Sequence, residues 1–231
     1  MKADWVVTTA LLGALATTQA IAADLAAGPE VPAAVKAEPG PWQVRLRGIY
    51  VLPEFSNRTL TVNAAPLAGA RIGVTDSIIP ELDITYYFTK NIAAELILAV
   101  TRHTAYGAGS ISALGSLGRS WLLPPTLTLQ YHFTDFGAFK PYIGGGINYT
   151  WFFNTNSNAL SNFSLRDNVG YVAQFGFDYA LDDHWGWNVD VKRVFLLTTA
   201  SGNLGASNGP RVTAPLRLDP WLIGTGLTYR F

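Results

Sequence analysis

Apolar and polar residues alternate with a period of two along most of the chain from Trp42 onward, and this pattern constrains the fold more than any other feature. In the last run, alternate positions are mostly apolar and end in two aromatic residues, while the positions between them, apart from Leu222, are small or polar. The mostly apolar set is Trp221, Ile223, Thr225, Leu227, Tyr229 and Phe231. Successive side chains of a β-strand point to opposite faces of a sheet. The pattern therefore predicts a strand with one apolar face.

Eight runs of this kind follow one another along the chain. They cover residues 42–52, 81–88, 92–100, 126–133, 141–152, 169–181, 185–192 and 221–231. The connections alternate between long and short, and the short ones are 89–91, 134–139 and 182–184. This order is typical of an all-β, eight-stranded antiparallel up-and-down sheet with long loops at one end. Both termini are then expected at the end that carries the tight turns.

Two kinds of barrel fit the alternation, and they differ in which face is inside. A soluble lipocalin-like barrel buries its apolar face, whereas a transmembrane barrel turns that face toward lipid. A soluble domain carries about 25% charged residues, but this chain has only 14% and could not coat a soluble barrel with charge. Aromatic residues also gather at the strand ends, as in the interfacial girdles of membrane barrels. The sequence therefore predicts a transmembrane β-barrel.

The polar face of the predicted barrel holds equal numbers of acidic and basic residues. Facing one another across a narrow lumen, these side chains can pair and avoid the cost of isolated buried charge. The predicted lumen charge network consists of Arg45, Arg47, Asp83, Glu95, Asp178, Asp190, Lys192 and Arg230.

The N-terminus has the pattern of a secretory signal peptide. Lys2 precedes an apolar stretch at 5–16, and Ala20 and Ala22 form a small-residue cleavage motif. We expect cleavage after Ala22; an amphipathic helix or anchor is the alternative. Residues 23–41 are rich in Ala and Pro and predict a flexible periplasmic segment, so the barrel covers 42–231. An exported barrel of this kind belongs in the outer membrane of a Gram-negative bacterium, with both termini periplasmic.

Composition and motifs argue against several other functions. The net charge is zero, so nucleic acid is not an expected partner. The histidines His103, His132 and His184 share no motif with a serine and an acid, so no enzyme is predicted. The Asp182–His184 stretch is interpreted as a polar turn rather than a metal site. The glycines at 144–146 relieve crowding in a strand rather than bind phosphate. No cofactor is expected.

Four segments resemble one family in particular. They are LPPTLTLQYHF (123–133), KPYIGGGINYTWFF (140–153), SLRDNVGYVAQFGFDY (164–179) and RLDPWLIGTGLTYRF (217–231). In this order they resemble the outer membrane protein W (OmpW) family, and the resemblance covers about 42–231. It implies an eight-stranded barrel with a narrow apolar-lined channel that passes small hydrophobic molecules, with an exit through the side of the wall. Lys192 departs from the inward aromatic residue that the resemblance implies at this position.

The residues suggest where such a route would run. Inward-facing apolar residues expected to line the channel are Ile49, Val51, Ile97, Val172 and Leu222. Pro53 has no N–H for a neighbouring strand, so it marks either a lateral gate or the end of a strand.

Partners follow from the predicted location of the barrel. They are outer-membrane lipid and lipopolysaccharide, small hydrophobic solutes, and the barrel assembly machinery, for which Phe231 is the expected signal. The alternative function is a structural or receptor-type barrel that acts through its extracellular loops.

Overall fold

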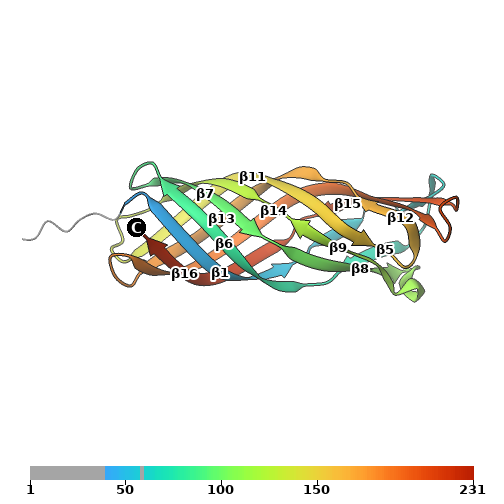
Figure 1. Cartoon of the computed structure of the whole chain (residues 1–231), viewed down its shortest axis with the longest axis horizontal. Helices are drawn as coiled ribbons and strands as arrows, with labels where there is room; N and C mark the ends of the chain where they lie inside the picture. Colours follow the sequence, from blue (N-terminus) through green and yellow to red (C-terminus); the bar gives the residue numbers. More distant parts are fainter. Residues whose placement is uncertain (1–39, 58–59) are drawn as a thin grey trace, which may run out of the picture. The chain divides into compact units, whose positions relative to one another are not determined.

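A computed structural model of the chain describes residues 40–57 and 60–231. Eight of its strands form a ring (Figure 1). They are β1 (Trp42–Leu52), β6 (Ser77–Tyr87), β7 (Ile92–Ala99), β10 (Thr126–His132), β11 (Phe139–Asn156), β13 (Asn168–Ala180), β14 (Trp185–Leu204) and β16 (Trp221–Arg230). Each pairs antiparallel with the next in this order, and β16 pairs with β1. The predicted all-β, eight-stranded up-and-down barrel is confirmed.

The register places apolar side chains outside the ring and polar side chains inside it. Leu46 of β1 lies opposite Leu82 and Leu227, and its side chain is 63% exposed. The neighbouring Arg45 lies opposite Asp83, and both are completely buried. Large exposed apolar and aromatic residues occur on every strand of the ring. This is the orientation of a transmembrane barrel, as the low charge content predicted.

Above the ring, the long connections are strands rather than the expected loops. The added elements are β2 (Phe55–Asn57), β3 (Thr61–Val62), β4 (Ala65–Pro66), β5 (Ala70–Val74), β8 (Thr101–Gly109), η1 (Ser112–Leu114), β9 (Ser116–Leu123), β12 (Leu160–Leu165) and β15 (Arg211–Leu218). The alternation continues past the predicted run in β14, where Val194, Leu196 and Thr198 are buried and Leu197 is exposed. The wall therefore extends well beyond the eight predicted runs.

These added strands form two groups. One group joins β5, β8, β9 and the end of β11, and the other joins β2, β3, β15, β12 and the end of β14. We call the ring the lower half and these two groups the upper half.

The described start of the chain and its C-terminus lie at the same end of the lower half. The backbone N–H of Phe231 donates to the carbonyl of Trp42 over 3.0 Å. The tight turns after β6, β10 and β13 lie at this end too (Figure 1). The predicted signal peptide and residues 23–39 lie outside the described residues. Within the described residues, no helix is long and apolar enough to cross a membrane.

Candidate functional site

Buried ion pairs cross the lumen of the lower half. Arg45 Nη2 lies 2.8 Å from Asp178 Oδ2, and Arg45 Nη1 pairs with Glu95. Arg47 Nη2 lies 2.6 Å from Asp83 Oδ2. These residues come from β1, β6, β7 and β13, so the ion pairs join strands from opposite sides of the ring.

Lys192 extends this network on β14. Its Nζ lies 2.6 Å from Glu81 Oε1 and 3.1 Å from Asp190 Oδ1, and Arg47 Nη2 lies 2.9 Å from the same Glu81 oxygen. Glu81 was not among the predicted network residues. It stands two positions before Asp83 in the same alternation, so parity alone would have placed it inside. We call the buried ion pairs of this paragraph and the last the ionic plug.

Neutral side chains complete the plug. The Gln130 amide donates to Glu95 over 2.6 Å, and the Gln174 amide donates to Asp190 over 2.9 Å. The Tyr142 hydroxyl donates to Asp190 over 2.8 Å. These side chains are all buried. The lower lumen is thus filled by a packed polar network rather than by an open passage.

Arg230 lies apart from the ionic plug, contrary to the prediction that it belongs to the lumen charge network. Its guanidinium lies 4.0 Å from the centre of the Tyr87 ring, and its Nε donates to the carbonyl of Gly40. Within the described residues it forms no ion pair. In the register of β1 with β16, Arg230 lies opposite Gln43, nearer to the tight-turn end than Arg45. Its neighbours there are therefore neutral.

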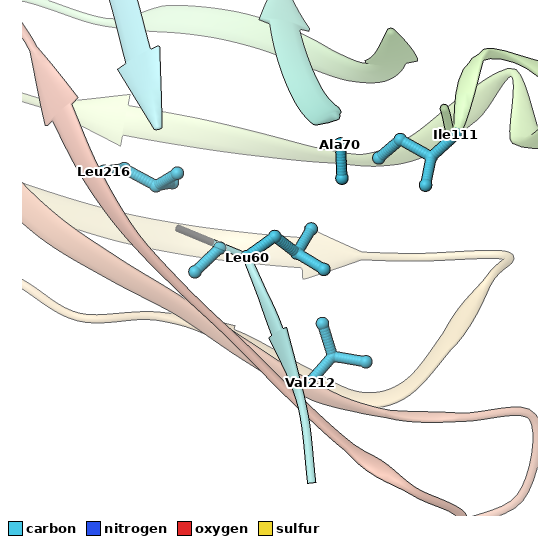
Figure 2. Packing of buried hydrophobic residues seen from close by; sticks show 6 residues of the cluster. Leu60, Ala70, Ile111, Val212 and Leu216 are labelled. Atoms are coloured by element: carbon cyan, nitrogen blue, oxygen red, sulfur yellow. The ribbon is translucent and has the colours of Figure 1, made fainter. Parts of the chain in front are cut away.

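An apolar cavity of about 380 Å³ occupies the upper half. Its lining comes from both strand groups, and Figure 2 labels five residues of the packed cluster beside it: Leu60, Ala70, Ile111, Val212 and Leu216. We call it the upper cavity. Its volume is within the range of small-molecule sites, about 300–1,000 Å³.

A smaller cavity of about 90 Å³ lies between the upper cavity and the ionic plug. Four of the five predicted channel residues line this lower cavity, namely Val51, Ile97, Val172 and Leu222. The fifth, Ile49, is buried between Arg47 and Val51 on β1, opposite Gly224, and belongs to neither lining. Polar residues also line the lower cavity: Glu81, Thr101, His103, Thr126, Asn148, Thr150 and Lys192. The sequence placed Lys192 in the lumen, but it did not predict that these residues lie together.

The wall is interrupted beside Pro53, which lines the upper cavity. The ladder between β1 and β6 ends at Val51 and Ser77. Above it, β2 pairs with β15 and β5 pairs with β8, and no ladder of the described residues joins β2 to β5 although they are neighbours. At the lower edge, the Tyr50 hydroxyl donates to Asp76 over 2.8 Å. We call this interruption the Pro53 seam.

The three histidines lie in different places. His132 is buried in the ionic plug, and His103 lines both cavities. In the turn before β14, Asp182 accepts the backbone N–H of Trp185 and of His184, which lowers the pKa of its carboxyl group. No cluster of three or more potential metal ligands occurs among residues 40–57 and 60–231.

Comparison with known proteins gives consistent matches. The OmpW family profile matches residues 38–231. The outer-membrane protein y4mB of Sinorhizobium fredii, itself uncharacterised, is 48% identical over 97% of this chain and 95% of its own length. Outer membrane protein AlkL of Ectopseudomonas oleovorans is 31% identical over 79% of this chain and 78% of its own. The dibenzothiophene metabolism operon protein PahQ of Pseudomonas aeruginosa is 26% identical over 84% of this chain and 90% of its own.

Solved structures agree with these matches. The crystal structure of OprG from Pseudomonas aeruginosa superposes with a TM-score of 0.76 at 30% identity, covering 84% of this chain and 98% of OprG. The solid-state NMR structure of AlkL gives a TM-score of 0.67 at 30% identity, covering 84% of this chain and 91% of AlkL. The chain belongs to the OmpW family, and it is a non-enzymatic β-barrel of the Gram-negative outer membrane.

Proposed function

We propose that this barrel gives small hydrophobic molecules passive passage across the outer leaflet, through the upper cavity and out through the Pro53 seam. The observation that carries the proposal is an apolar cavity of about 380 Å³ above a closed ionic plug. A solute entering from outside meets an apolar lining and then a charged floor. The solute therefore has a place to bind but no apolar path straight through the lower half.

The cavity lining favours apolar solutes. Phe152, Val212 and Leu216 are almost completely buried against it. Removing apolar solute surface from water is favourable by about 25 cal/mol per Å². The relative named for a dibenzothiophene metabolism operon is consistent with an apolar aromatic solute. Both observations support hydrophobic molecules as the solute class.

The ionic plug supports a lateral exit. A solute that moved straight toward the tight-turn end would have to separate buried charges such as Arg45 and Glu95, and stranding a buried charge costs several kcal/mol. Across the Pro53 seam the described residues form no buried ion pair, and the Tyr50–Asp76 hydrogen bond at its lower edge is exposed. Pro53 cannot donate to a neighbouring strand, and the ladder of β1 with β6 stops at Val51. An opening here would release the solute into the hydrocarbon.

We propose that the tight-turn end faces the periplasm. Phe231 lies at this end and is 59% exposed. An exposed aromatic residue here suits recognition by the barrel assembly machinery. The outward faces of β5, β8 and β9 carry three exposed arginines, Arg71, Arg102 and Arg119. Arg102 lies 5.9 Å from the centre of the exposed Trp121 ring. Guanidinium groups at an interface suit the phosphates of lipopolysaccharide.

Uptake of an apolar compound by a host with a tight outer membrane tests the proposal. Four variants are compared with the native chain and with an unrelated small barrel. Pro53→Val supplies an N–H at the seam, and its control is Pro215→Val, because Pro215 is an exposed strand proline outside the cavity lining. Ala214→Phe fills the upper cavity, and its control is Ala173→Phe, because Ala173 faces lipid.

We expect native uptake from the two controls and severalfold lower uptake from Ala214→Phe and Pro53→Val. Equal uptake by the native chain and the unrelated barrel, with the protein folded in the outer membrane, would overturn passage of this solute class. Lower uptake with Ala214→Phe but native uptake with Pro53→Val would support passage through the upper cavity and overturn the Pro53 seam as the exit.

A further inference from the structure

The lower cavity is a separate chemical environment at the bottom of the apolar route. It adjoins the upper cavity, because Val51, His103, Leu122, Leu218 and Pro220 line both. Its volume of about 90 Å³ has room for several waters, each of which needs about 10–15 Å³ on this measure. A solute that fills the upper cavity can therefore place one end here by displacing water.

Thr126, Asn148 and Thr150 line one side of the lower cavity, here called the wall, and they form a hydrogen-bonded chain whose donors are already used. Thr150 Oγ1 donates to Asn148 Oδ1 over 2.7 Å, and Asn148 Nδ2 donates to Thr126 Oγ1 over 2.7 Å. Thr126 Oγ1 in turn donates to the carbonyl of Pro124 over 3.0 Å. Thr150 Oγ1 and Asn148 Oδ1 therefore have free lone pairs but no free hydrogen. The wall can thus accept a hydrogen bond but has no hydroxyl hydrogen left to donate.

The floor adds negative charge. Glu81 Oε1 is held by Lys192 and Arg47, while Glu81 Oε2 has no hydrogen-bond partner within the described residues. The ionic plug beneath has five carboxylates against three cations, a formal excess of two negative charges: Glu81, Asp83, Glu95, Asp178 and Asp190 against Arg45, Arg47 and Lys192. An incoming carboxylate would be repelled here, whereas a neutral donor would not.

We propose that the lower cavity is a head-group site for a hydrophobic alcohol or phenol. The apolar body of the solute lies in the upper cavity, and its hydroxyl donates to Thr150 Oγ1, which accepts no hydrogen bond from the described residues. This inference rests on the proposed function and narrows its solute class from hydrophobic molecules in general to those carrying one neutral hydrogen-bond donor.

Methyl NMR of the full chain in lipid nanodiscs tests it. The barrel is titrated with 1-octanol, with 1-methoxyoctane, which keeps the oxygen but lacks the donor, with octanoate and with octane. Ile97 and Val172 methyls report on the lower cavity, and Val212 and Leu216 methyls report on the upper cavity. We expect 1-octanol to shift both sets and to bind about three- to tenfold more tightly than 1-methoxyoctane, the range of one net hydrogen bond. Octanoate should leave the lower-cavity methyls unshifted.

A matched pair of threonine variants assigns the effect to the wall. Thr150→Val removes the acceptor and should bring the affinities for 1-octanol and 1-methoxyoctane together. Thr128→Val is the control, because Thr128 is equally buried and inward-facing but lies outside the cavity lining, and its Oγ1 has no hydrogen-bond partner within the described residues. It should keep the native preference, and its methyl spectrum checks the fold.

The outcomes separate this inference from the proposed function. Shifts of the upper-cavity methyls with no preference for 1-octanol overturn only the head-group site. The same holds if octanoate shifts the lower-cavity methyls as strongly as 1-octanol, or if the preference survives Thr150→Val. No shift of the upper-cavity methyls with any of the four solutes would overturn binding in the apolar cavity, and with it the proposed route.

Discussion

The lower and upper halves of the barrel share one wall pattern but have opposite interiors. In the lower half, inward positions carry Arg45, Arg47 and Glu95, which are buried in ion pairs. In the upper half, inward positions of the same kind carry Val212 and Leu216, which line an apolar cavity. Alternation therefore fixes which residues face inward, whereas the identity of those residues decides whether the interior is a plug or a pocket.

Packing explains why the two interiors differ in openness. An eight-stranded ring leaves a lumen that side chains can fill, so long charged side chains reach partners on opposite strands. Above the ring, the strands separate into two groups, and no ladder of the described residues joins β2 to β5. Short side chains such as Ala200 and Ala214 leave a cavity there. The contrast leads to three further predictions.

The largest expected effect is on the ionic plug. Arg45→Met removes a buried cation and leaves Asp178 without its ion-pair partner and Glu95 with only Arg47 at 3.7 Å, which should lower the free energy of unfolding by about 3–5 kcal/mol. Urea unfolding in phospholipid vesicles measures it. Arg71→Met is the control, since Arg71 is exposed and should change stability by less than about 0.5 kcal/mol. Equal effects of the two substitutions would show that the plug contributes no more to stability than the exposed surface does.

A smaller effect is expected at a tightly packed glycine of the lower half. A Cβ added at Gly146 would lie 2.0 Å from the backbone oxygen of Leu127, so Gly146→Ala must move the strand and should cost about 1–3 kcal/mol. At the outward Gly145, a Cβ would lie 3.6 Å from the nearest atom, the carbonyl oxygen of Val172. There Gly145→Ala should be neutral or stabilising by up to about 1 kcal/mol. Unfolding midpoints measure the pair, and the same sign for both would contradict the crowding argument.

The smallest effect concerns the outer surfaces of the two halves. Arg102→Gln and Arg119→Gln should each weaken binding of purified lipopolysaccharide by about 1 kcal/mol, roughly fivefold, and the loss should shrink as salt is raised. Lys90→Gln, in an exposed turn at the opposite end, is the matched control. Identical affinities for all three variants and the native barrel would remove the basis for an arginine contact with the outer leaflet.

The sequence by itself determined the wall of the lower half and its orientation. Period-two alternation gave the eight strands, and the shortage of charge placed the apolar face toward lipid. The alternation also placed Arg45, Asp83 and Lys192 inside the barrel. Glu81 stands two residues before Asp83 in the same run, so the same rule places it inside too. These conclusions were available because side-chain direction in a strand depends only on position along the chain.

Only the tertiary structure decided what the inward residues do together. The stretch between Lys192 and Arg217 is rich in Gly, Asn and Ser and predicts a loop, although the alternation of β14 continues to Thr198. Arg230 faces the lumen, yet it stacks on Tyr87 because strand stagger places it below the plug. The wall of Thr126, Asn148 and Thr150 joins two strands through side-chain hydrogen bonds. Partners across a lumen depend on register and stagger between distant strands, and no local pattern in one strand carries that information.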